Sequence, residues 1–386
     1  MDRHQGPGLH ADRGHRIRRL TTRLTRTAAR AAALAAATSL GLAAAAPAQH
    51  PVIPRSLTAD SATRAALASR YPRDRSDTLP AFPLRQLAPG VYAVLGDTGR
   101  GVEGRSNAGF VVTSAGVVVI DALASPGEGR VLLRTIRSVT QQPVRYLVLT
   151  HHHPDHTFGA IVFKRAGARI IAHPDRRTLA NIDGDDRLAS DWTGVMGLEQ
   201  MRGFAYADTP DIPVRHDTAL VVGGRRIAIV RPGAAHTAGD LMVWLPDDRV
   251  LFAGDVLVED GVSMMVDGSS AAMLGALARI DSLDPRVAVP GHGRLATQPA
   301  TLVAATRCYV LALRDTMRRA VAAGVRMGQA IDRLPPADRD RPVSLHSRLR
   351  RNAVRVYSEM EHVLFDSTSS NAALVSEARE HAACPR

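Results

Sequence analysis

The sequence is poor in cysteine, lysine and aromatic side chains. Cys308 and Cys384 are its only cysteines, Lys164 is its only lysine, and Phe, Trp and Tyr make up 4% of the 386 residues. Neither cysteine stands in a metal-ligand pattern, so we expect no thiolate in a metal site. The two thiols could pair, or one could be buried and the other lie in a loose tail, because spacing alone does not fix geometry.

Positive charge is in excess, and arginine carries nearly all of it. The formal net charge is +12 at pH 7, and half of that excess lies within residues 1–48. The remainder is dispersed and lacks clusters of basic residues interleaved with aromatics, which argues against a nucleic-acid partner. The arginine content motivates a non-catalytic anion-binding protein as one alternative, and the dispersion of the charges disfavours it.

Residues 1–48 have the composition of an export signal. An arginine-rich start precedes an apolar run from about Ala28 to Ala46, and Ala46-Pro47-Ala48 is a small-x-small cleavage site. The run is too short and too rich in alanine for a spanning helix. We therefore expect a periplasmic or secreted protein with no stable membrane anchor after signal cleavage. A translation start later than Met1 is the alternative.

Changes of composition divide the rest of the chain into four parts. Residues 49–86 are polar and indicate an amino-terminal arm or linker, in which Asp60 could cap a helix over residues 60–69. Residues 87–298 alternate short β-branched runs with helical segments, which predicts helices packed on sheets. Residues 299–370 show helical apolar spacing, and residues 371–386 are typical of a frayed tail.

The strand-rich part also contains an insertion. Residues 175–213 break the alternation and form either a lid over a cleft or a solvated loop. Around it, the pattern predicts strands at 91–95, 108–113, 117–120, 144–149, 168–172, 219–222, 225–231, 241–245, 250–252 and 287–289. It predicts helices at 127–140, 155–166, 271–283, 300–323 and 344–365.

A short segment after one of these apolar runs, T-H-H-H-P-D-H, concentrates metal-ligand side chains. If the strand ends before the first histidine, His151 and His153 leave the chain on the same side, since side chains in extended backbone alternate. The following proline favours a turn, after which Asp155 and His156 open the next segment. Imidazole and carboxylate suit zinc, and imidazole also suits iron. One loop could therefore serve two adjacent metal ions.

Four further residues each follow an apolar strand candidate, where loops gather into a site: Asp121, His236, Asp255 and His292. A single histidine or aspartate after a strand is ordinarily a surface residue. Neighbouring glycines would allow tight turns and a close backbone approach at a crowded centre; these are Gly233, Gly254, Gly291 and Gly293. Together with the histidine loop, the four residues predict one metal centre.

The series His151-His152-His153-Pro154-Asp155-His156, followed by His236, Asp255 and His292, resembles the metallo-β-lactamase superfamily over about residues 87–293. The resemblance implies an α/β fold, a four-layer αβ/βα sandwich, which in this chain would carry a helical C-terminal extension. It implies a first metal ion on His151, His153 and His236, a second on Asp155, His156 and His292, and Asp255 bridging the two. It further implies that Asp121 orients the histidine loop without binding metal. The expected cofactor is two Zn²⁺, with iron or manganese as alternatives.

The ligand set indicates the chemistry. Two cations held by imidazoles and carboxylates would lower the pKa of a water between them, for zinc from about 16 to roughly 7. The hydroxide would attack a carbonyl, and Asp155 would orient it or accept a proton. His152 points to the opposite side of the loop, so we expect a structural or surface role for it. The expected function is an exported dinuclear metal hydrolase that acts on an ester, thioester, lactone or lactam of a small molecule.

The residue at position 255 bears on the substrate. A cysteine there would resemble the best-known class of β-lactam-hydrolysing members, whereas Asp255 makes the site more similar to glyoxalase II and to exported zinc hydrolases of the quinoprotein-relay type. A periplasmic β-lactamase is the alternative within the hydrolases. Iron-dependent sulfur or persulfide oxidation is the redox alternative. Persulfide dioxygenases look like enzymes with a mononuclear iron site, so the complete second ligand set disfavours the redox alternative.

Overall fold

The computed structural model describes residues 82–97, 105–175, 185–259, 261–334, 343–365, 377 and 379–384. All of them belong to one compact unit, residues 50–386. The expected export signal, its cleavage site, the expected helix at 60–69 and part of the insertion lie outside the described residues. Within these described ranges, no helix is both long enough and apolar enough to cross a membrane.

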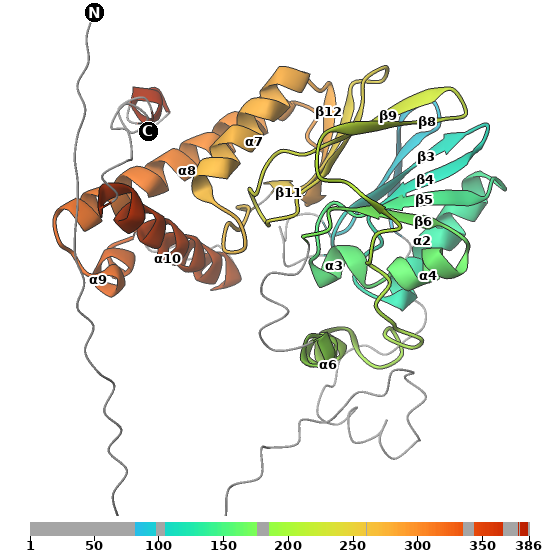
Figure 1. Ribbon diagram of the computed structural model, residues 1–386, viewed down its shortest axis with the longest axis horizontal. Helices are drawn as coiled ribbons and strands as arrows, with labels where there is room; N and C mark the ends of the chain where they lie inside the picture. The colour runs from blue at the N-terminus through green and yellow to red at the C-terminus, as the bar shows by residue number, and fades with distance from the viewer. Residues whose placement is uncertain are drawn as a thin grey trace, which may run out of the picture. The chain divides into compact units, whose positions relative to one another are not determined.

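Seven strands in sequential order form the first sheet (Figure 1). The first four strands are antiparallel neighbours, and the fourth to the seventh run parallel. Apolar β-branched runs form the central strands because both of their faces are buried. The strands are β1 (Leu84–Ala88), β2 (Val91–Val94), β3 (Ala108–Thr113), β4 (Gly116–Ile120), β5 (Val144–Val148), β6 (Arg169–Ala172) and β7 (Ile212–Pro213).

The second sheet has five strands in the order β12-β11-β10-β9-β8. Its strands pair antiparallel except β11 and β12, which are parallel. The expected Gly223-Gly224 turn joins β8 to β9, and both glycines have positive φ, which side chains rarely adopt. The strands are β8 (Thr218–Val222), β9 (Arg225–Val230), β10 (Met242–Leu245), β11 (Val250–Val258) and β12 (Val287–His292).

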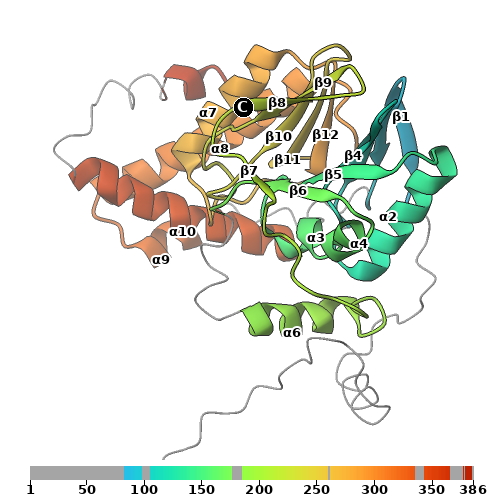
Figure 2. The same cartoon turned by 45° about the vertical axis from the view of Figure 1, so that its right-hand side comes forward.

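Three apolar layers hold the two sheets and their helices together. Helices α2 (Pro126–Val139) and α4 (Ala160–Arg165) cover the outer face of the first sheet, and side chains such as Phe110 and Leu132 fill that layer. Side chains of both sheets, including Phe252, form the middle layer. On the outer face of the second sheet lie α7 (Ser270–Leu283) and α8 (Pro299–Ala322) (Figure 2). This arrangement confirms the expected αβ/βα sandwich.

The described part of the insertion is a packed element. Helix α6 (Asp185–Met196) donates the Trp192 indole N–H to the Ala124 carbonyl at 2.7 Å. Trp192 also contributes to an aromatic cluster with Phe158, Phe204 and Tyr206. Phe158 directly follows the short helix α3 (Pro154–Thr157) of the histidine loop. The insertion therefore braces this loop and the β4–α2 connection through packed side chains.

The carboxy-terminal helices continue the outer layer of the second sheet. Helix α10 (Val343–Phe365) packs on α8, and a short helix that the sequence pattern missed, α9 (Met327–Asp332), lies between them in the chain. Cys308 of α8 forms a disulfide with Cys384. Glu377 accepts two hydrogen bonds from the buried Arg314 guanidinium. The described part of the tail is therefore attached to α8, whereas the sequence pattern predicts a frayed tail.

Several element boundaries differ from expectation. Strand β1 begins at Leu84, before the expected domain start at residue 87. The helix expected over 155–166 is two helices, α3 and α4, because Gly159 approaches the Ala122 carbonyl too closely for a Cβ and donates its N–H to Leu123. The strands expected to end at residues 252 and 289 continue to Val258 and His292, so Asp255 lies inside β11 and His292 ends β12.

Candidate metal centre

The histidine loop begins where strand β5 ends, against the second sheet. The Thr150 carbonyl accepts the Leu241 N–H at 2.7 Å. Gly254 packs on the Thr150 side chain with φ +53°, and a Cβ there would lie 2.8 Å from it. On the other side, Asp121 accepts hydrogen bonds from Thr150 N and Oγ1, both at 2.8 Å. These contacts fix the direction in which the loop leaves the sheet.

His151, His153 and His236 form a three-histidine set with Asp255. The four ligand atoms lie within 4.8 Å of one another, and His151, His236 and Asp255 are buried. His236 comes from the loop between β9 and β10, far from the histidine loop in sequence. The structure thus brings together the three residues expected at the first metal position and the expected bridging aspartate.

Within this set, two imidazoles face each other in an arrangement that calls for a cation. His153 Nδ1 lies 2.9 Å from His236 Nε2. The outer nitrogens are hydrogen donors: His153 Nε2 donates to Asp267 at 3.0 Å, and His236 Nδ1 donates to the Met264 carbonyl at 2.6 Å. In neutral rings the two facing nitrogens then both carry lone pairs, which repel unless a cation or a proton lies between them. The buried Nε2 atom of His151 also has no hydrogen-bond partner among the described residues.

Asp155, His156 and His292 form a second set. Asp155 Oδ2 lies 3.0 Å from His292 Nε2 and 3.6 Å from His156 Nε2. His156 directs its other nitrogen, Nδ1, at Asp121 Oδ2 at 2.9 Å. Asp121 therefore fixes the ring of one member of this set while it also holds the loop through Thr150. Asp121 has φ +58°, a conformation that aspartate tolerates better than most side chains.

Asp255 reaches both sets. Its Oδ2 lies 3.5 Å from His236 Nε2, and its Oδ1 lies 3.3 Å from His156 Nε2 and 3.6 Å from His292 Nε2. Only glycine fits opposite this carboxylate, since a Cβ on Gly291 would lie 1.8 Å from Oδ1. A side chain at position 291 would push the carboxylate away from one of the sets.

Burial and neighbouring charges shift the pKa values of this cluster in different directions. Burial lowers the pKa of His151 well below its ordinary value and that of His236 to about 4. Burial opposes charge on His156 as well, but the nearby carboxylates raise its pKa. Burial would raise the pKa of Asp255, yet the adjacent His292 and His156 hold it well below its ordinary value. Neutral imidazoles and ionised carboxylates are the forms that bind metal, so His151, His236 and Asp255 favour binding, whereas His156 would release a proton when an ion binds.

The donor set therefore fits metal ions. Seven nitrogen and oxygen ligands converge without a thiolate, and buried ligand atoms such as His151 Nε2 and Asp255 Oδ1 have no hydrogen-bond partner among the described residues. Unpaired buried polar atoms are costly unless a ligand satisfies them.

Sequence reasoning missed two carboxylates that orient the ligands. Asp267, after β11, holds His153, and nothing in its sequence context marks it. Asp240 accepts the backbone N–H groups of Ala235, His236 and Thr237 and the Thr237 hydroxyl. It ends the A-H-T-A-G-D segment that contains His236, so this segment was the available signal. Burial raises the pKa of Asp240 to about 6.

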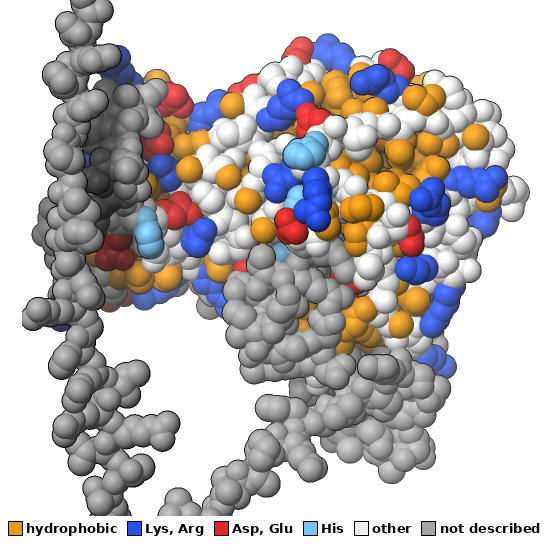
Figure 3. Space-filling model, viewed as in Figure 1, with side chains coloured by type: hydrophobic (Ala, Val, Ile, Leu, Met, Phe, Trp, Pro, Cys, Tyr) orange, Lys and Arg blue, Asp and Glu red, His pale blue; other side chains and the backbone are white. Residues whose placement is uncertain are grey.

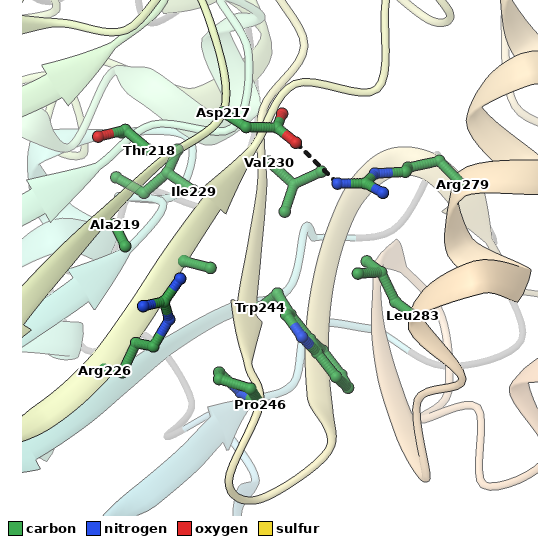
Figure 4. A pocket seen from close by; sticks show the side chains of 11 residues that line it. Asp217, Thr218, Ala219, Arg226, Ile229, Val230, Trp244, Pro246, Arg279 and Leu283 are labelled. Atoms are coloured by element: carbon green, nitrogen blue, oxygen red, sulfur yellow. Dashed lines mark hydrogen bonds and ion pairs between the residues drawn. The ribbon is translucent and has the colours of Figure 1, made fainter.

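Other features lie beside the centre or away from it. The ring of His152 packs against that of His153, with centroids 4.8 Å apart, and belongs to neither of the two sets above. A separate cavity of about 370 Å³ opens on the outer face of the second sheet beside α7. Trp244, Leu283 and the ion pair between Asp217 and Arg279 line it (Figure 4). It contains none of the predicted site residues.

Three curated relatives share part of this sequence. A 2,4-dinitroanisole O-demethylase subunit alpha from Nocardioides sp. is 25% identical over 46% of this chain and 49% of its own length. A metallo-beta-lactamase type 2 from Elizabethkingia meningoseptica is 25% identical over 46% of this chain and 63% of its own. A hydroxyacylglutathione hydrolase from Methylococcus capsulatus is 28% identical over 36% and 43%. The chain thus spans less than two thirds of each relative.

A solved structure and a family model agree on the fold. A metallo-beta-lactamase family protein from Thermus thermophilus superposes with a TM-score of 0.54 at 21% identity, over 72% of this chain and 94% of that one. The family model of the metallo-beta-lactamase superfamily matches residues 101–292, which contain both ligand sets and Asp255. The layered sheets, the loops at their edge and these matches show that the chain belongs to the metallo-beta-lactamase superfamily.

Proposed function

We propose that this protein is an exported, dinuclear metal-dependent hydrolase that cleaves an ester, thioester, lactone or lactam. The position of Asp255 carries the proposal. Its Oδ2 lies 3.5 Å from His236 Nε2 and its Oδ1 lies 3.3 Å from His156 Nε2, so one carboxylate contacts both ligand sets. A shared carboxylate supports two adjacent ions, as in two-metal hydrolytic sites.

The ligand chemistry favours zinc at both positions, and iron or manganese would also accept these donors. The first ion would lie on His151, His153 and His236, the second on Asp155, His156 and His292, with Asp255 between them. When bound, the ions would supply a water of lowered pKa and a Lewis acid for the carbonyl oxygen.

Asp155 is suited to meet the reacting groups. Its side chain is 23% exposed, against 5% for Asp255, so it can reach substrate from the edge of the centre. Burial would raise its pKa, but His156 and a hydrogen bond with His292 hold the pKa below its usual range. At neutral pH the carboxylate is ionised, so its role is to hold the second ion and to orient the nucleophile.

Two of the relatives, a beta-lactamase and a hydroxyacylglutathione hydrolase, are hydrolases by name, which supports hydrolysis as the reaction class. The match to the beta-lactamase also favours β-lactam hydrolysis as a second candidate. A substrate panel that contains penicillins, cephalosporins and carbapenems beside lactones and thioesters separates the two.

Two observations support export, and a third argues against a nucleic-acid partner. Cys308 and Cys384 are paired, and oxidising compartments maintain such bonds. Residues 1–48 have the composition of an export signal. Figure 3 shows Lys and Arg side chains dispersed among acidic and hydrophobic ones on the face in view, which is unlike a nucleic-acid-binding surface.

Metal analysis of the purified protein, coupled to hydrolysis of the panel, tests the proposal. We expect about two metal equivalents per chain and hydrolysis that stops on chelation and returns with zinc. His153→Ala and Asp255→Ala should abolish hydrolysis and remain folded by circular dichroism. His216→Ala, an exposed histidine outside the centre, is the matched control and should keep activity. Hydrolysis that survives complete metal removal would overturn the proposal, and one iron per chain with oxygen uptake would favour oxidation.

A further inference from the structure

The segment between β11 and α7 holds the three-histidine set in place. We call residues 261–269 the orienting loop. The Met264 carbonyl accepts the His236 Nδ1 hydrogen at 2.6 Å, and Asp267 accepts the His153 Nε2 hydrogen at 3.0 Å. Two of the three histidines thus take their ring orientation from one loop.

The orienting loop is also fixed close to the backbone that carries His236. The Ser269 N–H donates to the Ala235 carbonyl at 3.1 Å. Gly268 lies so near that a Cβ would be 2.1 Å from that carbonyl oxygen. A displacement of the orienting loop would therefore move His236 both through its ring and through its main chain.

A residue of the carboxy-terminal helix α10 also anchors the orienting loop. Asn352 is fully buried, with 0% of its surface exposed. Its Oδ1 accepts the Met265 N–H at 2.8 Å, and its Nδ2 donates to the Ser263 carbonyl at 2.9 Å. These two backbone groups flank Met264, whose carbonyl holds His236. One partner is a donor and the other an acceptor, so the side-chain amide satisfies both at once.

A second contact from the same helix fixes the end of the orienting loop. Glu359, two turns after Asn352, accepts the Ser270 N–H at the start of α7. The buried Arg314 of α8 donates to the Ser270 hydroxyl at 2.6 Å. Helices α8 and α10 therefore hold the orienting loop in its middle and at its end.

We propose that Asn352 is a positioning residue for the metal centre, and that through it the carboxy-terminal helices set the affinity of the three-histidine set for its ion. The inference rests on the proposed metal-dependent function. Asn352 contacts no ligand; it acts through the Met264 carbonyl on His236 and through the course of the loop on Asp267 and His153. The second set takes its orientation from Asp121, which lies on the β4–α2 connection. The effect should therefore be selective for one of two ions.

Chelator competition with zinc measures the two affinities separately. His151→Ala and His292→Ala assign the two binding steps to the two sets. Asn352→Leu removes both hydrogen bonds to the loop backbone. Asn352→Asp keeps the acceptor for the Met265 N–H, but it places a carboxylate oxygen against the Ser263 carbonyl oxygen, where no hydrogen bond can form. We expect both variants to lower the zinc affinity of the three-histidine set by about 10- to 100-fold, the range for groups that orient metal ligands. The other step should change much less.

Two controls separate positioning from stability. Val356→Ala truncates a fully buried side chain one turn along α10, so it lowers the melting temperature while it leaves both backbone hydrogen bonds of Asn352 in place. Tyr309→Phe removes only the hydroxyl that accepts from Asn352 Nδ2 at 3.0 Å. Neither variant should change the zinc affinity of either ligand set. If Asn352→Leu does not fold, the Asp variant makes the same comparison.

Equal weakening of both steps, or unchanged affinities in a folded Asn352 variant, would overturn the inference. A wild-type protein that binds no metal would instead overturn the proposed function, so the two failures are distinguishable.

Discussion

Asp267 accepts a hydrogen bond from His153 Nε2 at 3.0 Å, although the two residues are 114 positions apart in sequence. This carboxylate selects the tautomer that leaves His153 Nδ1 free to face His236. Asp267→Ala should weaken binding of the ion at the three-histidine set by about 10- to 100-fold. Asp267→Asn, which can still accept the hydrogen bond but lacks the charge, should fall between alanine and wild type. Chelator competition measures both, with Asp217→Ala, which breaks an exposed ion pair, as the control. An asparagine variant weaker than the alanine variant would contradict this role.

Asp121 should be sensitive to substitution in two separate ways. It accepts from Thr150 N and Oγ1 and from His156 Nδ1, and its backbone has φ +58°. Asp121→Asn keeps a residue type that tolerates this backbone conformation. Its amide N–H group would face donors from Thr150 or His156, so the metal affinity of the second set should fall, with a small decrease in melting temperature. Asp121→Ala adds backbone strain and leaves buried polar groups unpaired, so it should lower the free energy of unfolding by about 1–3 kcal/mol more. Thermal unfolding of the metal-free variants measures the difference. Equal stability of the two would refute the strain argument.

Glu128 should make stability fall as pH rises. Its side chain is buried at the start of α2, where it accepts the Ala124 N–H at 2.9 Å, and burial raises the pKa of Glu128 from 4.5 to about 7. Between these values the folded state keeps a proton that the unfolded chain releases, so the free energy of unfolding decreases with rising pH and levels off above about 7. Relative to Glu128→Gln, wild type should lose up to about 3 kcal/mol across this window.

Denaturant unfolding of metal-free protein at a series of pH values tests this slope. The exposed Glu380→Gln is the matched control, and its curve should parallel that of wild type. Parallel curves for wild type and Glu128→Gln would show that the carboxyl does not titrate in this range.

The disulfide should stabilise the carboxy-terminal helices against unfolding. Cys308 and Cys384 are 76 positions apart, and closing a loop of this length stabilises the fold by about 4 kcal/mol in the loop-entropy account. Reductant should therefore lower the melting temperature of wild type. The double variant Cys308→Ser with Cys384→Ser should start lower and be insensitive to reductant. A wild-type melting temperature that ignores full reduction, verified by thiol titration, would contradict the prediction.

Local pattern was enough to predict most of the sheets. Residues 108–113 and 144–148 form strands where β-branched runs indicate them, and residues 223–224 turn where two glycines permit it. The same reasoning failed where a distant contact decides the local structure. The helix after the histidine loop breaks at Gly159 because the Ala122 carbonyl approaches it, and β11 continues past Phe252 because β12 pairs alongside it.

The predicted ligands were accessible from sequence because four of them share one short loop and the other three each follow an apolar strand candidate. The structure brings all seven together, and their role as ligands remains a prediction for metal analysis. The groups that orient them gave little or no signal. Asp267 lies 114 positions from His153, and Asn352 lies 87 positions from Met265, and neither residue type is conspicuous where it stands. Sequence pattern identifies the residue types that can bind metal, whereas the orientation of their side chains depends on tertiary packing.

The contact between Asn352 and the orienting loop bears on what a minimal fragment of this protein could do. The stretch that matches the family model, residues 101–292, contains every predicted ligand. A fragment cut at those limits would nevertheless leave the Met265 N–H and the Ser263 carbonyl without their amide partner, and would remove α8 and α10 from the outer layer of the second sheet. The limits of the family match are therefore narrower than the packed unit around the candidate centre, which includes α10.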